Sequence, residues 1–216
     1  MSDPLRFPVP TSYETPRLLL RPFSVADASQ LHEALVESIG ALRENLWFLP
    51  WVAEDPTLES AEARCRQAEG NFLLRADLPY LAFERGSGRL VASVGLHRTD
   101  WSLPATEVGY WVRSSEVGKG YASEGVCALT AWALDGLGAQ RVALVTDELN
   151  AGSRAVALRC GFRLEGVLRH AARSPDGRLR STCLYARLPG EGRPLAGGWL
   201  RRSADGEPEP RNPKEA

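Results

Sequence analysis

The pattern of apolar and polar residues divides the first third of the chain into one strand and three helices. Residues 17–21 form a short apolar run, which is typical of a strand. Ser24 occupies a helix N-cap position, with Asp27 at the reciprocal capping position, and apolar residues follow at helical spacing. Two more helices are expected, over 41–48 and from a Thr57 cap to about residue 74.

The middle of the chain predicts a strand-rich segment followed by a long helix. Three strands are expected over 80–84, 90–97 and 106–112, and turn residues between the first two make them a hairpin. A loop with two glycines comes next, and it leads into a helix over 121–137.

The last predicted elements are a strand over 141–146, a helix over 150–160 and strands over 162–168 and 182–188. This order predicts a mixed α/β fold, with a largely antiparallel central sheet flanked by helices and not a doubly wound parallel sheet.

Length and composition suggest one domain with extensions at both ends. Residues 1–14 are expected to be an N-terminal extension, and 15–188 the domain itself. From 189 to 216, Pro, Gly and mixed charges dominate, so a mostly disordered C-terminal tail is expected.

Charge and cysteine content exclude several classes of function. The net charge of −1 provides no basic field to attract nucleic acid or an anionic membrane. No apolar run approaches the ~18 residues needed to cross a bilayer, and the first residues lack a signal-peptide pattern, so a cytoplasmic protein is expected. Four widely spaced cysteines are expected to be reduced thiols, and without a ligand cluster no metal site is expected. They are Cys65, Cys127, Cys160 and Cys183.

The segment from Val112 to Glu124 carries the clearest chemical signal. A strand ends, a loop with Gly118 and Gly120 follows, and a helix starts at once. The first N–H groups of a helix lack internal partners and lie at the positive end of its dipole, so they bind anions, and glycines allow a phosphate to approach closely. The glycine spacing fits neither a P-loop nor a dinucleotide fingerprint, and an ordinary strand-to-helix loop is the alternative.

Several stretches, taken together, resemble the GNAT superfamily of N-acetyltransferases. Residues 107–112 and 118–124 are similar to "E-x-G-Y-W" and "G-K-G-Y-A-T-E" in its ribosomal-protein N-terminal (alanine/serine) acetyltransferase, or Rim-type, branch. Residues 15–21, 150–153 and 160–166 resemble further motifs of that branch, in the same order. The resemblance spans about 15 to 188 and implies the GNAT-like acyl-CoA N-acyltransferase fold.

The resemblance also implies a site for acetyl-CoA as cosubstrate, without a metal. The Val112 backbone is expected to pair with the pantetheine arm, and Asn150 to hydrogen-bond the pantetheine or thioester region, near Ser153. Asn150 is equally well explained as a helix N-cap. The residues expected to bind the pyrophosphate are Gly118, Lys119, Gly120, Tyr121, Ala122 and Ser123.

Two catalytic residues are proposed by resemblance. Ser153 is the candidate general acid that protonates the leaving thiolate, and Glu107 is the candidate base, acting through water. His97 is a second candidate base because histidine titrates near neutral pH. Glu107 can also be read as a solvated edge carboxylate. Where members of the branch carry acidic residues near the last strands, this chain has Ala172 and Arg180, which leaves the base and the acceptor open.

The predicted function is transfer of acetyl to an amine, with a protein N-terminal α-amine as the leading acceptor. The alternatives are a small amine, such as a polyamine, amino acid or antibiotic, and a non-catalytic acetyl-CoA-binding module. A homodimer is possible in this family. Four arginines near the last hairpin can attract an acidic peptide or the cofactor's phosphates, or simply form a solvated basic face. They are Arg169, Arg173, Arg178 and Arg180.

Overall fold

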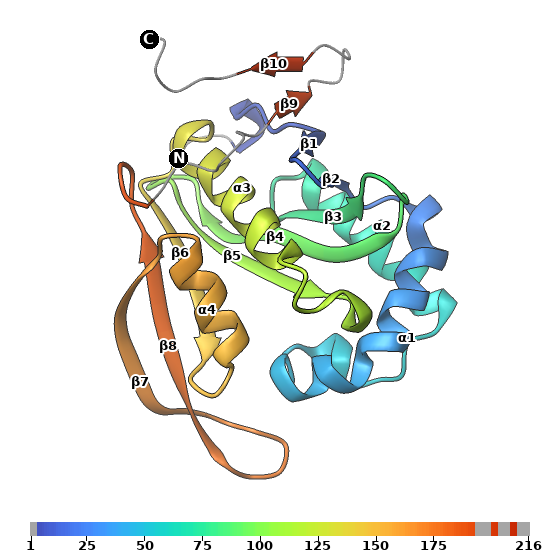
Figure 1. The fold of residues 1–216 in the computed structure, drawn as a ribbon, viewed down its shortest axis with the longest axis vertical. Coiled ribbons are helices and arrows are strands. Elements are labelled where there is room, and N and C mark those ends of the chain that lie inside the picture. The colour runs from blue at the N-terminus through green and yellow to red at the C-terminus, as the bar shows by residue number, and fades with distance from the viewer. Residues whose placement is uncertain (1–3, 193–199, 203–207, 211–216) are drawn as a thin grey trace.

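The computed structural model describes residues 4–192, 200–202 and 208–210, and its centre is one large sheet (Figure 1). The strand order is β10-β9-β1-β2-β3-β4-β5-β6-β8-β7. The pair β5–β6 is parallel, and the other neighbouring pairs are antiparallel. The predicted mixed α/β class with a largely antiparallel sheet is therefore confirmed.

The elements have the following bounds. The strands are β1 (Ser12–Glu14), β2 (Leu18–Pro22), β3 (Leu78–Glu84), β4 (Leu90–Asp100), β5 (Ala105–Val112), β6 (Arg141–Asp147), β7 (Arg163–Arg173), β8 (Leu179–Arg187), β9 (Leu200–Arg202) and β10 (Pro208–Pro210). The α-helices are α1 (Ala28–Asn45), α2 (Leu58–Leu73), α3 (Tyr121–Asp135) and α4 (Ala151–Arg159). Four short 3-10 segments are η1 (Pro4–Arg6), η2 (Val25–Asp27), η3 (Pro50–Val52) and η4 (Ser114–Glu116).

Helices cover both faces of the sheet and enclose two apolar clusters. Helices α3 and α4 pack on one face (Figure 1). Trp132 of α3 is fully buried there. Helix α1 and most of α2 contribute to the second cluster, on the other face. On β3, Tyr80 belongs to the first cluster and Leu81 to the second, because successive strand side chains point to opposite faces. No helix in the described ranges is both long and apolar enough to span a bilayer.

The structure differs from the predicted elements in three places. The helix expected over 41–48 is the end of α1, which runs unbroken to Asn45, and Pro50 then starts η3 instead of ending a helix. The final hairpin is longer than expected, since β7 reaches Arg173 and β8 begins at Leu179. β1 lies inside the expected N-terminal extension.

The predicted tail over 189–216 falls largely outside the described residues. Within it, Leu200–Arg202 and Pro208–Pro210 form β9 and β10, and β9 pairs with β1. These short strands had no apolar alternation that would have predicted them.

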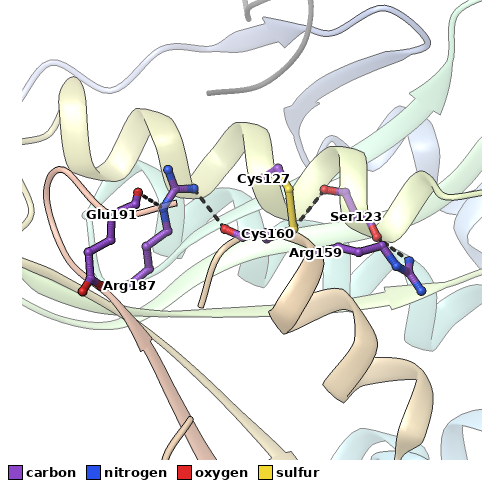
Figure 2. The surroundings of a disulfide bond; sticks show 6 residues. All are labelled: Ser123, Cys127, Arg159, Cys160, Arg187 and Glu191. Atoms are coloured by element: carbon purple, nitrogen blue, oxygen red, sulfur yellow. Dashed lines mark hydrogen bonds between the residues drawn. A yellow bond between two sulfur atoms is a disulfide. The ribbon is translucent and has the colours of Figure 1, made fainter. Parts of the chain in front are cut away.

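Cys127 and Cys160 form a disulfide, so the expectation of four reduced thiols is wrong for this pair (Figure 2). They are 33 residues apart in the sequence, but α4 ends against α3 and brings their Cα atoms to 5.1 Å. The spacing of the two cysteines in the sequence does not predict this packing. Cys65 and Cys183 are free and buried.

Candidate active site

The loop between β5 and α3 has the geometry of an anion site. Gly118 and Gly120 adopt φ of +83° and +86°, which L-residues with a side chain rarely adopt, and Gly120 is the N-cap of α3. The Glu124 N–H is the first in the helix with an internal acceptor, the Gly120 carbonyl at 3.0 Å. The N–H groups of 121–123 come before it, at the positive end of the helix dipole. All six residues predicted to bind the pyrophosphate lie at this point.

The N-terminal segment fixes the start of α3 through one carboxylate. The Thr15 hydroxyl donates to Glu124 Oε1 at 2.6 Å, and Arg17 Nε donates to Glu124 Oε2 at 2.6 Å. Arg17 also donates to the Lys119 carbonyl at 2.8 Å and lies over the Tyr121 ring. The sequence of residues 15–21 resembled the family but gave no indication of their role. The structure shows that this segment positions the anion-binding loop, which lies more than a hundred residues away in the sequence.

Helix α1 holds the other end of the same loop. Glu37 accepts hydrogen bonds from Arg113 Nε at 2.6 Å and from the Ser115 N–H at 2.7 Å. The hydrogen bonds from Ser115, together with the bond and charge of Arg113, lower the pKa of Glu37 to about 2, against the opposing effect of burial. This charged contact ties η4 to α1, so the loop is anchored on both sides.

Strands β5 and β6 separate beyond their first few residues. Their parallel pairing ends at Glu107 and Ala143, whereas β5 continues to Val112 and stays paired with β4 there. Among the described residues, the edge of β5 that faces β6 therefore has no strand partner from 108 to 112. Val112, the predicted pantetheine contact, lies on this open edge, next to the anion-binding loop.

A serine and a tyrosine meet at the open edge. Asn150 is the N-cap of α4, and its Oδ1 accepts from the Ser153 N–H at 2.9 Å. The Tyr110 hydroxyl donates to Ser153 Oγ at 2.9 Å. Burial raises the pKa of Tyr110, and the hydrogen bond to Ser153 opposes this only in part, so the phenol stays protonated at neutral pH. Since Ser153 accepts from Tyr110, its own hydroxyl proton is available for another acceptor.

Tyr110 and Arg159 are two site residues that the sequence reasoning did not single out. Strand alternation places Tyr110 on the opposite face from Glu107, but its contact with α4 needs the tertiary structure. Arg159, in the last turn of α4, donates to Ser123 Oγ at 2.9 Å, beside the disulfide (Figure 2). It adds a positive charge at the N-terminus of α3.

The two candidate bases are both engaged by neighbours. Glu107 forms an ion pair with Arg98 and lies on the sheet face opposite Tyr110 and Ser153, so the structure does not bring Glu107 into direct contact with Ser153. His97 is the cross-strand neighbour of Glu107, and its Nδ1 is 3.3 Å from Asp77 Oδ1.

Glycine makes room for the His97 ring. A Cβ added at Gly95 would lie 2.8 Å from His97 Nε2, and one at Gly109 would lie 3.1 Å from His97 Cδ2. The glycine of the "E-x-G-Y-W" stretch thus has a packing role in this chain.

The chain resembles known proteins in sequence. Residues 17–163 match the acetyltransferase (GNAT) domain family. The chain is 29% identical over 159 residues to the "Putative ribosomal N-acetyltransferase YdaF" of Bacillus subtilis (strain 168), covering 70% of this chain and 81% of that protein.

Solved structures share the fold at lower identity. The microcin C7 self immunity acetyltransferase MccE, in complex with acetyl-CoA and AMP, has a TM-score of 0.73 at 20% identity, covering 81% of this chain and 93% of that one. The ribosomal L7/L12 α-N-protein acetyltransferase RimL, in complex with coenzyme A, has a TM-score of 0.73 at 21% identity, covering 81% and 96%. The family match spans most of the chain, including the anion-binding loop and the open edge of β5, and the protein therefore belongs to the GNAT family of N-acetyltransferases.

Proposed function

We propose that this protein transfers the acetyl group of acetyl-CoA to a protein N-terminal α-amine. The observation that carries the proposal is the Tyr110–Ser153 hydrogen bond at the open edge of β5, beside the helix N-terminus that would hold a phosphate. The fold neighbours MccE and RimL were solved with acetyl-CoA and with coenzyme A, which supports the choice of donor.

The residues present fit acetyl-CoA. Gly118 would leave space for the pyrophosphate, because a Cβ built there meets nothing within 4 Å. The N–H groups of Gly118 and of residues 120–123, together with the Arg159 guanidinium, would supply donors and positive charge, whereas the Lys119 N–H already donates to the Glu116 carbonyl at 3.4 Å. The open edge of β5 up to Val112 leaves backbone groups that could pair with the pantetheine amides. Asn150 lies beside Ser153, because its Oδ1 accepts from the Ser153 N–H.

Different residues of this chain would carry out the two proton transfers of the reaction. When bound, acetyl-CoA supplies a thioester whose carbonyl carbon accepts the amine nitrogen, so the C–S bond breaks, the sulfur needs a proton and the amine must lose one. Ser153 Oγ holds the proton for the sulfur, and Tyr110 holds Ser153 in the orientation that presents it. General acid catalysis of this kind contributes about 10²–10⁴-fold in rate.

The base remains assigned to Glu107, with His97 as the alternative. For Glu107 to take a proton through water, one of its carboxylate oxygens must bind that water, either together with Arg98 or after leaving Arg98. An α-amine places a modest demand on the base, because its pKa of about 8 leaves a useful neutral fraction at physiological pH. A lysine side chain, with a pKa near 10.4, would need more help.

A small amine is the second candidate acceptor. The names of YdaF and RimL support a ribosomal-protein acceptor, whereas MccE is named as an antibiotic-immunity enzyme on the same fold. A non-catalytic acetyl-CoA-binding module is a third reading, which any turnover would eliminate.

The test is thiol release from acetyl-CoA with a panel of amines. The panel contains peptides with N-terminal Ser, Ala or Met, the same peptides with a blocked N-terminus, polyamines and aminoglycosides. We expect turnover only with free N-terminal peptides, and a large loss of kcat in Ser153→Ala. Turnover restricted to small amines would contradict the proposed acceptor. Acetyl-CoA binding without turnover on any amine would favour the non-catalytic module.

A further inference from the structure

The β7–β8 hairpin is basic, although the whole chain has a net charge of −1. Its acidic residues are Glu165 and Asp176. Its arginines outnumber them and are Arg163, Arg169, Arg173, Arg178, Arg180 and Arg187.

Ion pairs neutralise part of this charge, and the buried Arg187 donates to the Glu191 and Cys160 carbonyls, which leaves two exposed arginines over. Asp176 pairs with Arg178, and Arg180 pairs with Asp147 of β6 at 2.8 Å. Within the described ranges, Arg169 and Arg173 have no carboxylate partner. Arg173 donates to the Gly177 carbonyl at 2.7 Å, and both side chains are exposed. The hairpin therefore presents uncompensated positive charge to the solvent.

The same part of β7 borders an open hollow with both apolar and polar side chains. The register between β7 and β8 shifts between Leu168 and Ala172, and His170 in the shifted segment has a φ of +52°. An open hollow of about 610 Å³ lies here, lined by Val167, Leu168, Arg169 and His170. Val167 and Leu168 are 37% and 50% exposed. Two exposed apolar side chains thus share this hollow with Arg169.

This surface lies close to the candidate active site. The Glu148 N–H donates to the Ser181 carbonyl of β8 at 2.9 Å, and the His170 N–H donates to Ser181 Oγ at 3.4 Å. Glu148 is followed closely in the sequence by Asn150, the N-cap of α4, and by Ser153 in the first turn of that helix. Figure 1 shows the tip of the hairpin projecting beyond the end of β6 and the start of α4.

We propose that this hairpin docks an acidic segment of the acceptor polypeptide, an inference that rests on the proposed function. Arg169 and Arg173 pair with its carboxylates, and the hollow takes one apolar side chain. The bulge disrupts regular addition of another strand to β7, so side-chain charge and not backbone pairing selects the partner. Such contacts speed association and weaken with salt.

The test compares a double substitution with a matched control. The test variant is Arg169→Ala with Arg173→Ala, and the control is Arg43→Ala with Arg66→Ala, which removes the same charge from α1 and α2, away from the hairpin. Fluorescence anisotropy follows a labelled acidic peptide and a neutral one, both with a free N-terminus, at rising ionic strength. Thermal melting confirms that both variants fold.

The expected result is a loss confined to the acidic peptide. Its Kd should rise about tenfold in the test variant, as the loss of two charge contacts implies, and the salt dependence should shrink. The control variant and the neutral peptide should match wild type. Equal affinity for the acidic peptide in test variant and wild type would overturn the proposal. So would a raised KM for acetyl-CoA alone, which would assign the arginines to the cofactor's phosphates.

Peptide binding is measured independently of turnover, so the experiment can contradict the docking surface without contradicting the proposed acceptor, and the reverse. If the acidic peptide binds through the arginines but is never acetylated, the proposed acceptor is wrong and the docking surface stands. If peptides are acetylated with no preference for acidic ones, the proposed acceptor stands and the docking surface is wrong.

Discussion

At the scale of single residues, the chemistry depends on one hydroxyl pair. Ser153 is the proposed proton donor because it lies in the first turn of α4 at the open edge of β5, but an isolated serine hydroxyl rotates freely. Tyr110 removes that freedom by donating to Ser153 Oγ at 2.9 Å. The resemblance to the family predicted Ser153 as a site residue. The sequence pattern indicated only that Tyr110 is one apolar position of an alternating strand. Its role required knowing which helix covers that face of β5.

Tyr110→Phe should lower kcat about tenfold, with the KM for acetyl-CoA nearly unchanged, because the ring still packs and only the hydrogen bond is lost. Since Tyr110 acts through Ser153, the double variant Tyr110→Phe with Ser153→Ala should be no slower than Ser153→Ala alone. Steady-state kinetics on the four proteins checks this. Multiplicative losses in the double variant would show that the two residues act independently.

At the scale of elements, the N-terminus of α3 is the proposed anion site, and the helix is tied to two other parts of the chain. Thr15 and Arg17 bind its Glu124, and the disulfide binds its Cys127 to the end of α4. Periodicity predicted the start of α3 and its glycine loop. It did not predict these ties, because each joins segments distant in sequence.

The disulfide should stabilise the fold by about 3.7 kcal/mol, since it closes a loop of 33 residues in the unfolded chain. Denaturant unfolding of wild type and of the variant Cys127→Ser with Cys160→Ser measures this. A thiol reductant should bring wild type to the stability of the variant and leave the variant itself unchanged. A wild-type midpoint that does not respond to reductant would show that the bond contributes nothing.

The contact of Glu37 with the loop should make stability depend on pH. Its folded-state pKa of about 2 lies below its ordinary value of 4.5, so ionised Glu37 stabilises the fold above pH 4.5, and the effect is lost as pH falls towards 2. Glu37→Gln should therefore cost on the order of 1–2 kcal/mol near neutral pH, and less in acid.

Urea unfolding near neutral pH and near pH ~3 tests this for the variant and for Glu62→Gln as a control. Glu62 forms an exposed pair with Arg66 one helical turn away, so its replacement should change little at either pH. A Glu37→Gln penalty of the same size at both pH values would contradict the assignment.

At the scale of the whole molecule, the order of elements was sufficient to predict the class of fold. Alternating strands and capped helices gave the mixed sheet because each pattern is local in sequence. The long β7–β8 hairpin escaped prediction in part because β7 is exposed along most of its length, so it has no apolar alternation to mark its extent. β1 is three residues long, too short to show a period.

The central claim is that the loop before α3 holds acetyl-CoA, and one matched pair of substitutions tests it. Gly118 and Gly88 both have positive φ, and at both a Cβ would meet nothing within 4 Å, so alanine carries a similar backbone cost at either position. Only Gly118 lies at the start of α3. Calorimetric titration with acetyl-CoA should show affinity reduced at least about tenfold in Gly118→Ala and unchanged in Gly88→Ala. Equal affinity in the two variants would contradict the account.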